Sequence, residues 1–315
     1  KARILVFAAA AIVLTGCTSP SPVTTDTAAR TPTVTPTVGT NTWSAPGSVV
    51  VTALPLGDGH LSTSAPSVGT LFACQAGDPN GPGSPVDGPW IHGSTWNLNE
   101  KIVVQGDVKW PTAALTVHVS GSQRVITTND LPVGFGTGTF PIAANDPAAK
   151  YDRNPNSISS SQNITVTLPV APKASASPNC LNGGAIGVLL NGVLLYNAVD
   201  AKGRDAVAHE EQDLCQGHPQ NEGQYHYHEV PTCLRDNATG TSTVVGWAND
   251  GYPIVVERDA AGNLPNNADL DACHGRTGPV SIDGAVTTTY HYDATLEFPY
   301  TIGCFHGTSA VRSGP

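Results

Sequence analysis

Two histidines separated by a single residue are the feature of this sequence most suited to binding a metal or to catalysis. His226 and His228 alternate with Tyr225 and Tyr227, so on a β-strand both histidines would project from the same face. The strand rise places their Cβ atoms roughly 6–7 Å apart, close enough for two imidazoles to chelate one metal ion. Imidazole is a common protein ligand for zinc, copper and iron. The pattern therefore predicts a site on this strand for a divalent metal ion or a small polar ligand.

Further ligands are expected among the polar residues that precede the strand. His218, held in a Gly-His-Pro turn, is the preferred third ligand. His209 and Asp213 are possible additional ligands, while Glu210 and Asp250 are expected to orient the histidines by hydrogen bonding. Because the cysteines are expected to be oxidised, the ligands should be nitrogen and oxygen atoms, and the ion should be divalent: Zn, Cu or Fe.

Other interpretations of these residues stay open. The histidines also fit a packed strand of a purely structural or interaction module. A hydrolase is a further alternative, in which histidines and carboxylates converge on an extracytoplasmic substrate. The segment His209–Asp213 approaches the zinc-protease pattern His-Glu-x-x-His with Asp in place of the second His, but that pattern requires a helix. A binding protein is preferred over an enzyme, and no residue is assigned a catalytic role.

The elements that must position these residues belong to an internal repeat. Residues 187–196 match residues 246–255 at a constant offset, which aligns the pair Asn191-Gly192 with Asp250-Gly251. Landmarks further along recur in the same order, so repeats are expected at about 183–238 and 242–307. An Asn-Gly or Asp-Gly pair between apolar runs is a strong hairpin signal, and each repeat should open with a hairpin.

The second copy departs from the first at two of the three proposed ligand positions. Asp293 stands at the position of His228, and Arg276 stands at the position of His218. Arg276 would bring a positive charge to that site, so only the first copy is expected to bind metal.

Short alternating runs elsewhere indicate the fold class. Residues 115–119 and 164–168 alternate apolar and polar side chains between Gly, Pro and Asn residues, as half-buried strands do. The sequence therefore predicts a mainly β protein with antiparallel sheets. Residues 43–172 should form an N-terminal β region, and residues 173–315 the duplicated, disulfide-stabilised domain.

The cysteine count of seven is odd. Residues 1–16 have the basic start and short apolar run of a signal peptide, and they end in Leu-Thr-Gly before Cys17, which resembles a bacterial lipobox. Cys17 is then expected to carry a lipid that anchors the chain to a bacterial membrane, outside the cytoplasm. Residues 17–42, rich in Ser, Thr and Pro, should form a tether.

Six cysteines remain for three disulfides. A repeat favours the same bond in each copy, which pairs Cys215 with Cys233 and Cys273 with Cys304, and leaves Cys74 for Cys180. Pairing that crosses between the repeats is the alternative.

The charge composition excludes other classes of protein. Charged residues make up 13% of the 315 residues, and the net charge is −10 with no basic block. A coiled coil needs more charge, and nucleic-acid binding needs basic patches. A protein or small-molecule partner is not identified by the sequence.

Several motifs together resemble the YHYH-domain proteins, and the likeness extends from about residue 95 onward. They are Gly217-His218-Pro219, Gly223–His228, Asp250–Ile254 and Phe298–Cys304, with Thr128–Pro132 and Asn154–Ile158 before them. The resemblance implies a secreted or cell-envelope protein. It implies no particular activity.

Overall fold

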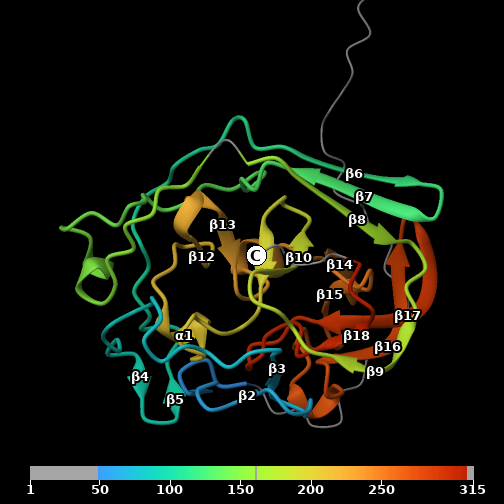
Figure 1. Ribbon diagram of the computed structural model, residues 1–315, viewed down its shortest axis with the longest axis horizontal. Coiled ribbons are helices and arrows are strands. Elements are labelled where there is room, and N and C mark those ends of the chain that lie inside the picture. Colours follow the sequence, from blue (N-terminus) through green and yellow to red (C-terminus); the bar gives the residue numbers. More distant parts are fainter. Residues whose placement is uncertain (1–48, 160–161, 311–315) are drawn as a thin grey trace, which may run out of the picture. The chain divides into compact units, whose positions relative to one another are not determined.

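The computed structural model describes residues 49–159 and 162–310 (Figure 1), all of which belong to one compact unit, Val34–Pro315. The expected signal peptide, Cys17 and the tether lie outside the described residues. Within the described ranges, no helix is long and apolar enough to cross a membrane.

The described residues form mainly β structure, as predicted. The strands are β1 (Leu54–Pro55), β2 (Leu61–Ser62), β3 (Leu71–Phe72), β4 (Ile91–His92), β5 (Thr95–Trp96), β6 (Leu115–Ser120), β7 (Gln123–Thr128), β8 (Ile164–Pro169), β9 (Ala174–Asn179), β10 (Ala185–Leu189), β11 (Leu194–Tyr196), β12 (Gly217–Pro219), β13 (Tyr225–Tyr227), β14 (Ser242–Ala248), β15 (Pro253–Glu257), β16 (Gly275–Ile282), β17 (Ala285–Asp293) and β18 (Phe305–Gly307). The helices are α1 (Ala206–His209) and α2 (Thr232–Arg235), with 3₁₀ turns at Pro147–Lys150, Asn221–Gly223 and Asn267–Asp269.

An eight-stranded sheet carries the two predicted repeats. Its strand order is β12-β13-β11-β10-β14-β15-β17-β16, so each repeat contributes one half and the halves meet where β10 pairs with β14 (Figure 1). Both halves have the same pairings: an antiparallel hairpin, a parallel pair and an antiparallel outer pair. The two segments therefore have the same strand topology, which supports the interpretation as a repeat.

Two pairs in this sheet depart from the expected antiparallel arrangement. Strand β11 runs parallel to β13, and β15 runs parallel to β17. Parallel neighbours need a connection that crosses back along the sheet, and here the long segments after β11 and β15 make it. Hairpin signals in the sequence report only the local antiparallel pairs, so they did not indicate these two.

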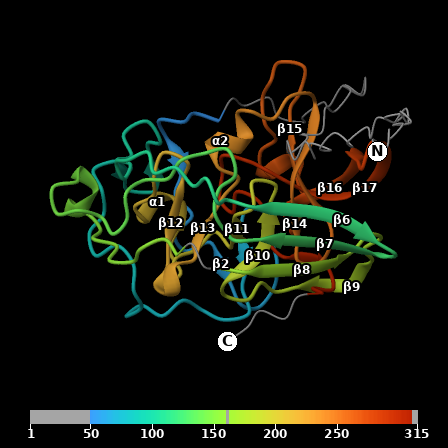
Figure 2. The same cartoon turned by 90° about the horizontal axis from the view of Figure 1, so that it is seen from above.

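The N-terminal region packs a second sheet against the repeats. Strands β6, β7 and β8 lie side by side in both views (Figures 1 and 2). Their buried Ile126 and Leu168 share a core with Val188 and Trp247 of the repeats. The expected regions 43–172 and 173–315 thus share a hydrophobic core. In the outer strand β6, Leu115 is partly buried but Val117 and Val119 on the same face are exposed, contrary to the alternation that predicted a half-buried strand.

The two hairpin turns form at Asn191-Gly192 and Asp250-Gly251, as predicted, and both rest on the sheet of β6 to β8. Gly192 and Gly251 have φ values of +91° and +90°, a conformation that glycine adopts without steric cost. A Cβ atom on Gly251 would lie 2.7 Å from Cγ of Pro169 in β8. The turn therefore requires glycine for its conformation and for its close approach to β8.

We expect Gly251→Ala to lower the free energy of unfolding by about 2–4 kcal/mol, because left-handed strain and overlap with Pro169 add together. Gly284→Ala is the matched control. Gly284 also has a positive φ, +84°, but nothing lies within 4 Å of its added Cβ, so only the strain of about 1–2 kcal/mol should appear. Urea unfolding of both variants measures the difference, and equal losses would contradict the packing of this turn on β8.

The structure contains three disulfides: Cys74–Cys180, Cys215–Cys233 and Cys273–Cys304. This is the pairing that the repeat favours, with one bond inside each copy. The crossed alternative does not occur. The bond Cys74–Cys180 joins the N-terminal region to the segment that leads into β10.

Candidate metal site

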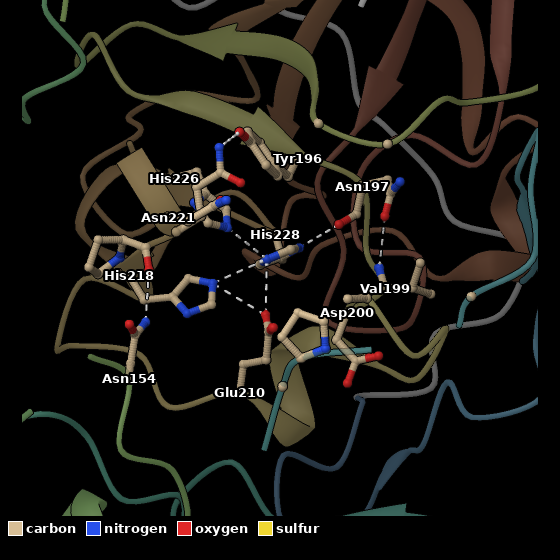
Figure 3. Close-up of a pocket in the computed structure, with 18 of the residues that line it drawn as sticks. Asn154, Tyr196, Asn197, Val199, Asp200, Glu210, His218, Asn221, His226 and His228 are labelled. Carbon is tan, nitrogen blue, oxygen red and sulfur yellow. Dashed lines mark hydrogen bonds and ion pairs between the residues drawn. The ribbon is translucent and has the colours of Figure 1, made fainter. Parts of the chain in front are cut away.

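The three histidines expected to bind metal lie on two neighbouring strands. In the antiparallel pair of β12 and β13, His218 is directly opposite His226, and His228 follows β13 by one residue. All three side chains are buried, with exposed fractions of 3–5%. Figure 3 shows their rings converging on one point beside Glu210.

The alternation of Tyr and His in β13 gives this strand two different faces. Tyr225 and Tyr227 are fully buried in the main hydrophobic core, while His226 lines a pocket on the other side. Gly217 in β12 accommodates the Tyr225 ring, since a Cβ atom there would lie 2.3 Å from that ring. The tyrosines thus anchor the strand, and the histidines face the pocket.

The nitrogen and oxygen atoms of the cluster lie at ligand–ligand distances. His228 Nε2 is 3.3 Å from His218 Nε2 and 3.2 Å from His226 Nε2. Oε2 of Glu210 is 3.2 Å from His218 Nε2 and 3.1 Å from His228 Nε2. Three potential ligand atoms, from His218, His226 and Glu210, therefore surround His228 Nε2 (Figure 3).

Hydrogen bonds to the main chain decide which ring nitrogens face the centre of the cluster as acceptors. Nδ1 of His228 lies 2.5 Å from the carbonyl oxygen of Asn197, and Nδ1 of His226 lies 3.3 Å from that of Gln224. A carbonyl oxygen only accepts, so each Nδ1 carries the proton, and each neutral ring directs an Nε2 lone pair inward. Lone pairs at 3.2 Å repel one another unless a proton or a cation lies between them. Histidine ligands in metal sites typically make this carbonyl contact.

Glu210 supplies the negative charge of the cluster. It follows α1 directly, and the N-cap Asp205 accepts a hydrogen bond from Ala208 within that short helix. Burial alone would raise the pKa of Glu210, but His218 and His228 beside it hold that pKa well below its usual value. Glu210 is therefore ionised. From the sequence, Glu210 was expected only to orient the histidines. In the structure it lies as close to His218 and His228 as His228 lies to the other two histidines.

His226 and His228 differ in the direction in which their pKa values are shifted. Burial, reinforced by the neighbouring His218 and His228, lowers the pKa of His226 well below its usual value. Burial also acts to lower the pKa of His228, but its hydrogen bond to Glu210 and the charge of Glu210 outweigh it and raise that pKa. In the metal-free protein His226 is thus neutral, and His228 is the ring that takes up a proton.

The cluster lies in a pocket of about 610 Å³. Tyr196 stacks on His226 with 4.0 Å between ring centroids. The lining is rich in carboxamides and, among the described residues, contains no Lys or Arg; the carboxamides are those of Gln75, Asn154, Asn156, Asn197, Gln220 and Asn221. Such a lining suits a small, polar, uncharged or cationic ligand more than an anion.

Three residues expected at the site lie elsewhere. The Asp213 carboxylate accepts hydrogen bonds from Tyr225 Oη and from the main chain of Gly138, so it lies on the tyrosine face of β13. His209 ends α1 and contacts Asp58 at 2.9 Å. The expectation that Asp213 and His209 could be ligands is wrong in this geometry. The zinc-protease pattern is also not formed, because α1 ends at His209.

Asp250 is the third of these residues. Its carboxylate accepts a hydrogen bond from Tyr292 Oη at 2.5 Å and another from the main chain of Gly307. It stabilises the second repeat and does not contact the histidines of the first.

The sequence reasoning missed the contacts that come from other segments. Tyr196 ends β11 and Asn197 follows it; β11 is parallel to β13, and this pairing brings both residues to the histidines. Nδ2 of Asn154 donates to the carbonyl oxygen of Pro219 at 2.8 Å and so holds the end of β12 beside His218. Asn154 belongs to one of the motifs that resemble the YHYH-domain proteins, and that motif was the available signal.

Comparison with known proteins agrees with those motifs. Residues 165–265 match the family described as YHYH protein, a segment that contains the three histidines, Glu210 and the first hairpin of each repeat. This segment is therefore a YHYH domain, although the match is narrower than the likeness from about residue 95 onward. The chain matches no curated protein and no solved structure.

Proposed function

We propose that this protein binds one divalent transition-metal ion through His218, His226, His228 and Glu210, and that the ion forms part of the floor of a pocket for a small polar ligand. The observation that carries the proposal is the convergence of three imidazole Nε2 atoms and one carboxylate oxygen in a buried place. A buried, ionised carboxylate and inward lone pairs both favour a cation there.

Four of the six distances among these atoms match a tetrahedral ion, and the group whose ligand atoms all lie within 4.8 Å of one another consists of the three histidines without Glu210. Ligands at about 2.0–2.1 Å from a tetrahedral ion lie about 3.3–3.4 Å from each other. The four distances around His228 Nε2 and Glu210 Oε2 are 3.1–3.3 Å. Three imidazoles with one carboxylate suit Zn, Fe or Cu. When bound, the ion would supply Lewis acidity at the pocket, and the carboxamides would orient a polar ligand beside it.

A pH titration of binding tests this proposal. Because Glu210 raises the pKa of His228, a proton competes with the ion for Nε2 of that ring. His226, with a lowered pKa, has no proton to lose there. We expect metal binding to release a proton from His228 and to weaken as the pH falls from about 8 to about 6.

The measurement is isothermal titration with Zn²⁺ in buffers of different ionisation enthalpy, which counts the protons released. Metal analysis of protein without an affinity tag gives the stoichiometry. The absence of Zn²⁺ binding, or binding with the same affinity at both pH values, would show that the proposal is wrong.

We also propose that the protein is held at a bacterial membrane, outside the cytoplasm, by a lipid on Cys17. The support is the sequence Leu14–Cys17 after a short apolar run, together with the three disulfides, which are typical of oxidising compartments. Mass spectrometry of the peptide that contains Cys17 tests this, because a diacylglycerol adds a defined mass.

A further inference from the structure

A second cluster of potential ligands lies in the other half of the sheet. Glu257 ends β15, and His291 and Asp293 lie on β17, with one ligand atom from each within 4.8 Å of the others. The side chains of all three are buried, with exposed fractions of 0–1%. Asp293 and His291 correspond to His228 and His226 in the repeat.

The local geometry at His291 repeats that at His226. Nδ1 of His291 lies 3.2 Å from the carbonyl oxygen of Thr289, two residues before it, as Nδ1 of His226 does with Gln224. The neutral His291 ring therefore directs its Nε2 lone pair inward. That Nε2 faces Oε1 of Glu257 at 3.3 Å and Oδ2 of Asp293 at 3.7 Å. The Nε2 lone pair of His291 therefore faces the carboxylates of Glu257 and Asp293, and no hydrogen atom lies between them.

Asp293 is a buried carboxylate in this cluster that has ion-pair contacts but no hydrogen bond. Neither of its carboxylate oxygens accepts a hydrogen bond, and Nε2 of His291 makes none. A buried carboxylate without hydrogen bonds is destabilising, because its desolvation is not compensated. The nearest cation, Nε of Arg276, is 3.8 Å from Oδ2 of Asp293. The cluster is therefore open to a further positive charge.

Arg276 makes the two clusters equal in charge. It pairs with Oε2 of Glu257, the oxygen that points away from His291, and leaves Oε1 facing inward. With neutral imidazoles, Glu257, Asp293 and Arg276 sum to one negative charge, the same as Glu210 with three histidines. The arginine at the position of His218 thus offsets the additional carboxylate and orients Glu257. Its charge does not by itself exclude a second ion, contrary to the expectation from sequence.

We propose that Glu257, His291 and Asp293 form a second cation site, distinct from the histidine cluster and selective for a harder divalent ion. One imidazole with two carboxylates offers more hard oxygen ligands than three imidazoles do, so this cluster suits Mn²⁺ better than the histidine cluster does. Arg276, which pairs with Glu257, has about a quarter of its side chain exposed, whereas the three ligand side chains are buried. The side chain must move aside for the ion to enter.

Mn²⁺ is the probe for this site, with electron paramagnetic resonance to count bound ions in the full chain. The test variant is Glu257→Gln/Asp293→Asn, which keeps the shape of both side chains and removes their charge. The matched control is Glu100→Gln/Asp107→Asn, which makes the same changes at exposed carboxylates. We expect the test variant to bind about one Mn²⁺ fewer than the wild type and the control to bind the same number.

Thermal unfolding separates a metal site from a purely structural ion cluster. If the carboxylates serve a metal, the test variant in EDTA should unfold at the same or a higher temperature than the wild type, and Mn²⁺ should stabilise only the wild type and control. A lower unfolding temperature in EDTA with no effect of Mn²⁺ on any variant would overturn the proposal. Mn²⁺ binding that appears only in Arg276→Gln would also overturn it, because the guanidinium would then be the resident cation. Neither outcome affects the histidine cluster, which Zn²⁺ binding tests separately.

Discussion

The variant His226→Ala/His228→Ala is expected to lose about one equivalent of bound Zn²⁺, with a loss of affinity at this site of at least about 100-fold. Both residues direct an Nε2 atom into the cluster, 3.2 Å apart. Their removal leaves His218 and Glu210, which are too few ligands for a tight site. Metal analysis and isothermal titration measure the loss.

The matched control is His92→Ala/His118→Ala, which removes two exposed histidines from β4 and β6. It should bind as much Zn²⁺ as the wild type. A second pair of substitutions, His226→Asn/His228→Asn, guards against unfolding of the alanine variant. Asparagine can still donate to the carbonyl oxygens of Gln224 and Asn197 but offers no atom at the Nε2 position. Retention of Zn²⁺ by a folded asparagine variant would show that these histidines are structural.

The variant Glu210→Gln tests whether Glu210 is a metal ligand or a general base. If the carboxylate is the fourth ligand, its loss should weaken Zn²⁺ binding by about 10-fold or more. If the variant binds Zn²⁺ as well as the wild type does, three histidines hold the ion and Glu210 is free to take a proton. That result would favour the alternative of a metal-dependent hydrolase.

The second large effect is expected from the disulfide that joins the two regions. Cys74–Cys180 closes 106 residues, whereas Cys215–Cys233 closes 18. Loop entropy in the unfolded chain predicts losses of about 4.8 and about 3.2 kcal/mol when these bonds are removed. We expect Cys74→Ser/Cys180→Ser to be less stable than Cys215→Ser/Cys233→Ser by about 1.6 kcal/mol.

Urea unfolding of both double variants measures this difference, and each serves as the control for the other. Removal of Cys74–Cys180 should also affect the pocket, because the pocket is lined by three residues that flank this bond: Ala73, Gln75 and Leu181. We therefore expect weaker Zn²⁺ binding in Cys74→Ser/Cys180→Ser at urea concentrations that leave most of the wild type folded. A larger loss of stability from the shorter loop would contradict the entropic argument.

The parts of the site that sequence reasoning identified depend on short-range spacing. His226 and His228 share a face because β13 is a strand, and His218 is in register with His226 because β12 pairs with β13 through a short connection. The assignment of Asp213 failed for a related reason. A residue in an irregular segment has no periodicity that would indicate its face, and only the hydrogen bond to Tyr225 shows which side it takes.

The parts that were missed depend on pairing between distant segments. Asn197 reaches His228 because β11 runs parallel to β13, and Asn154 reaches Pro219 across 65 residues of chain. Glu257 reaches His291 and Asp293 through the parallel pair of β15 and β17. At the aligned position the first repeat has Ala198, so the repeat itself could not indicate this carboxylate.

The sequence by itself determined the β class, the two hairpins, the strand of alternating Tyr and His, and a disulfide pairing that the structure shares. Each of these features follows from local spacing or from repetition, and both can be read directly from the order of residues in the sequence. Tertiary structure alone decided that Glu210 joins the histidines, that Asp213 and His209 do not, and that a second acidic cluster lies opposite Arg276. These outcomes depend on parallel crossovers and on burial. A buried charge is stable only beside a polar or oppositely charged group, and here that group lies far away in the sequence.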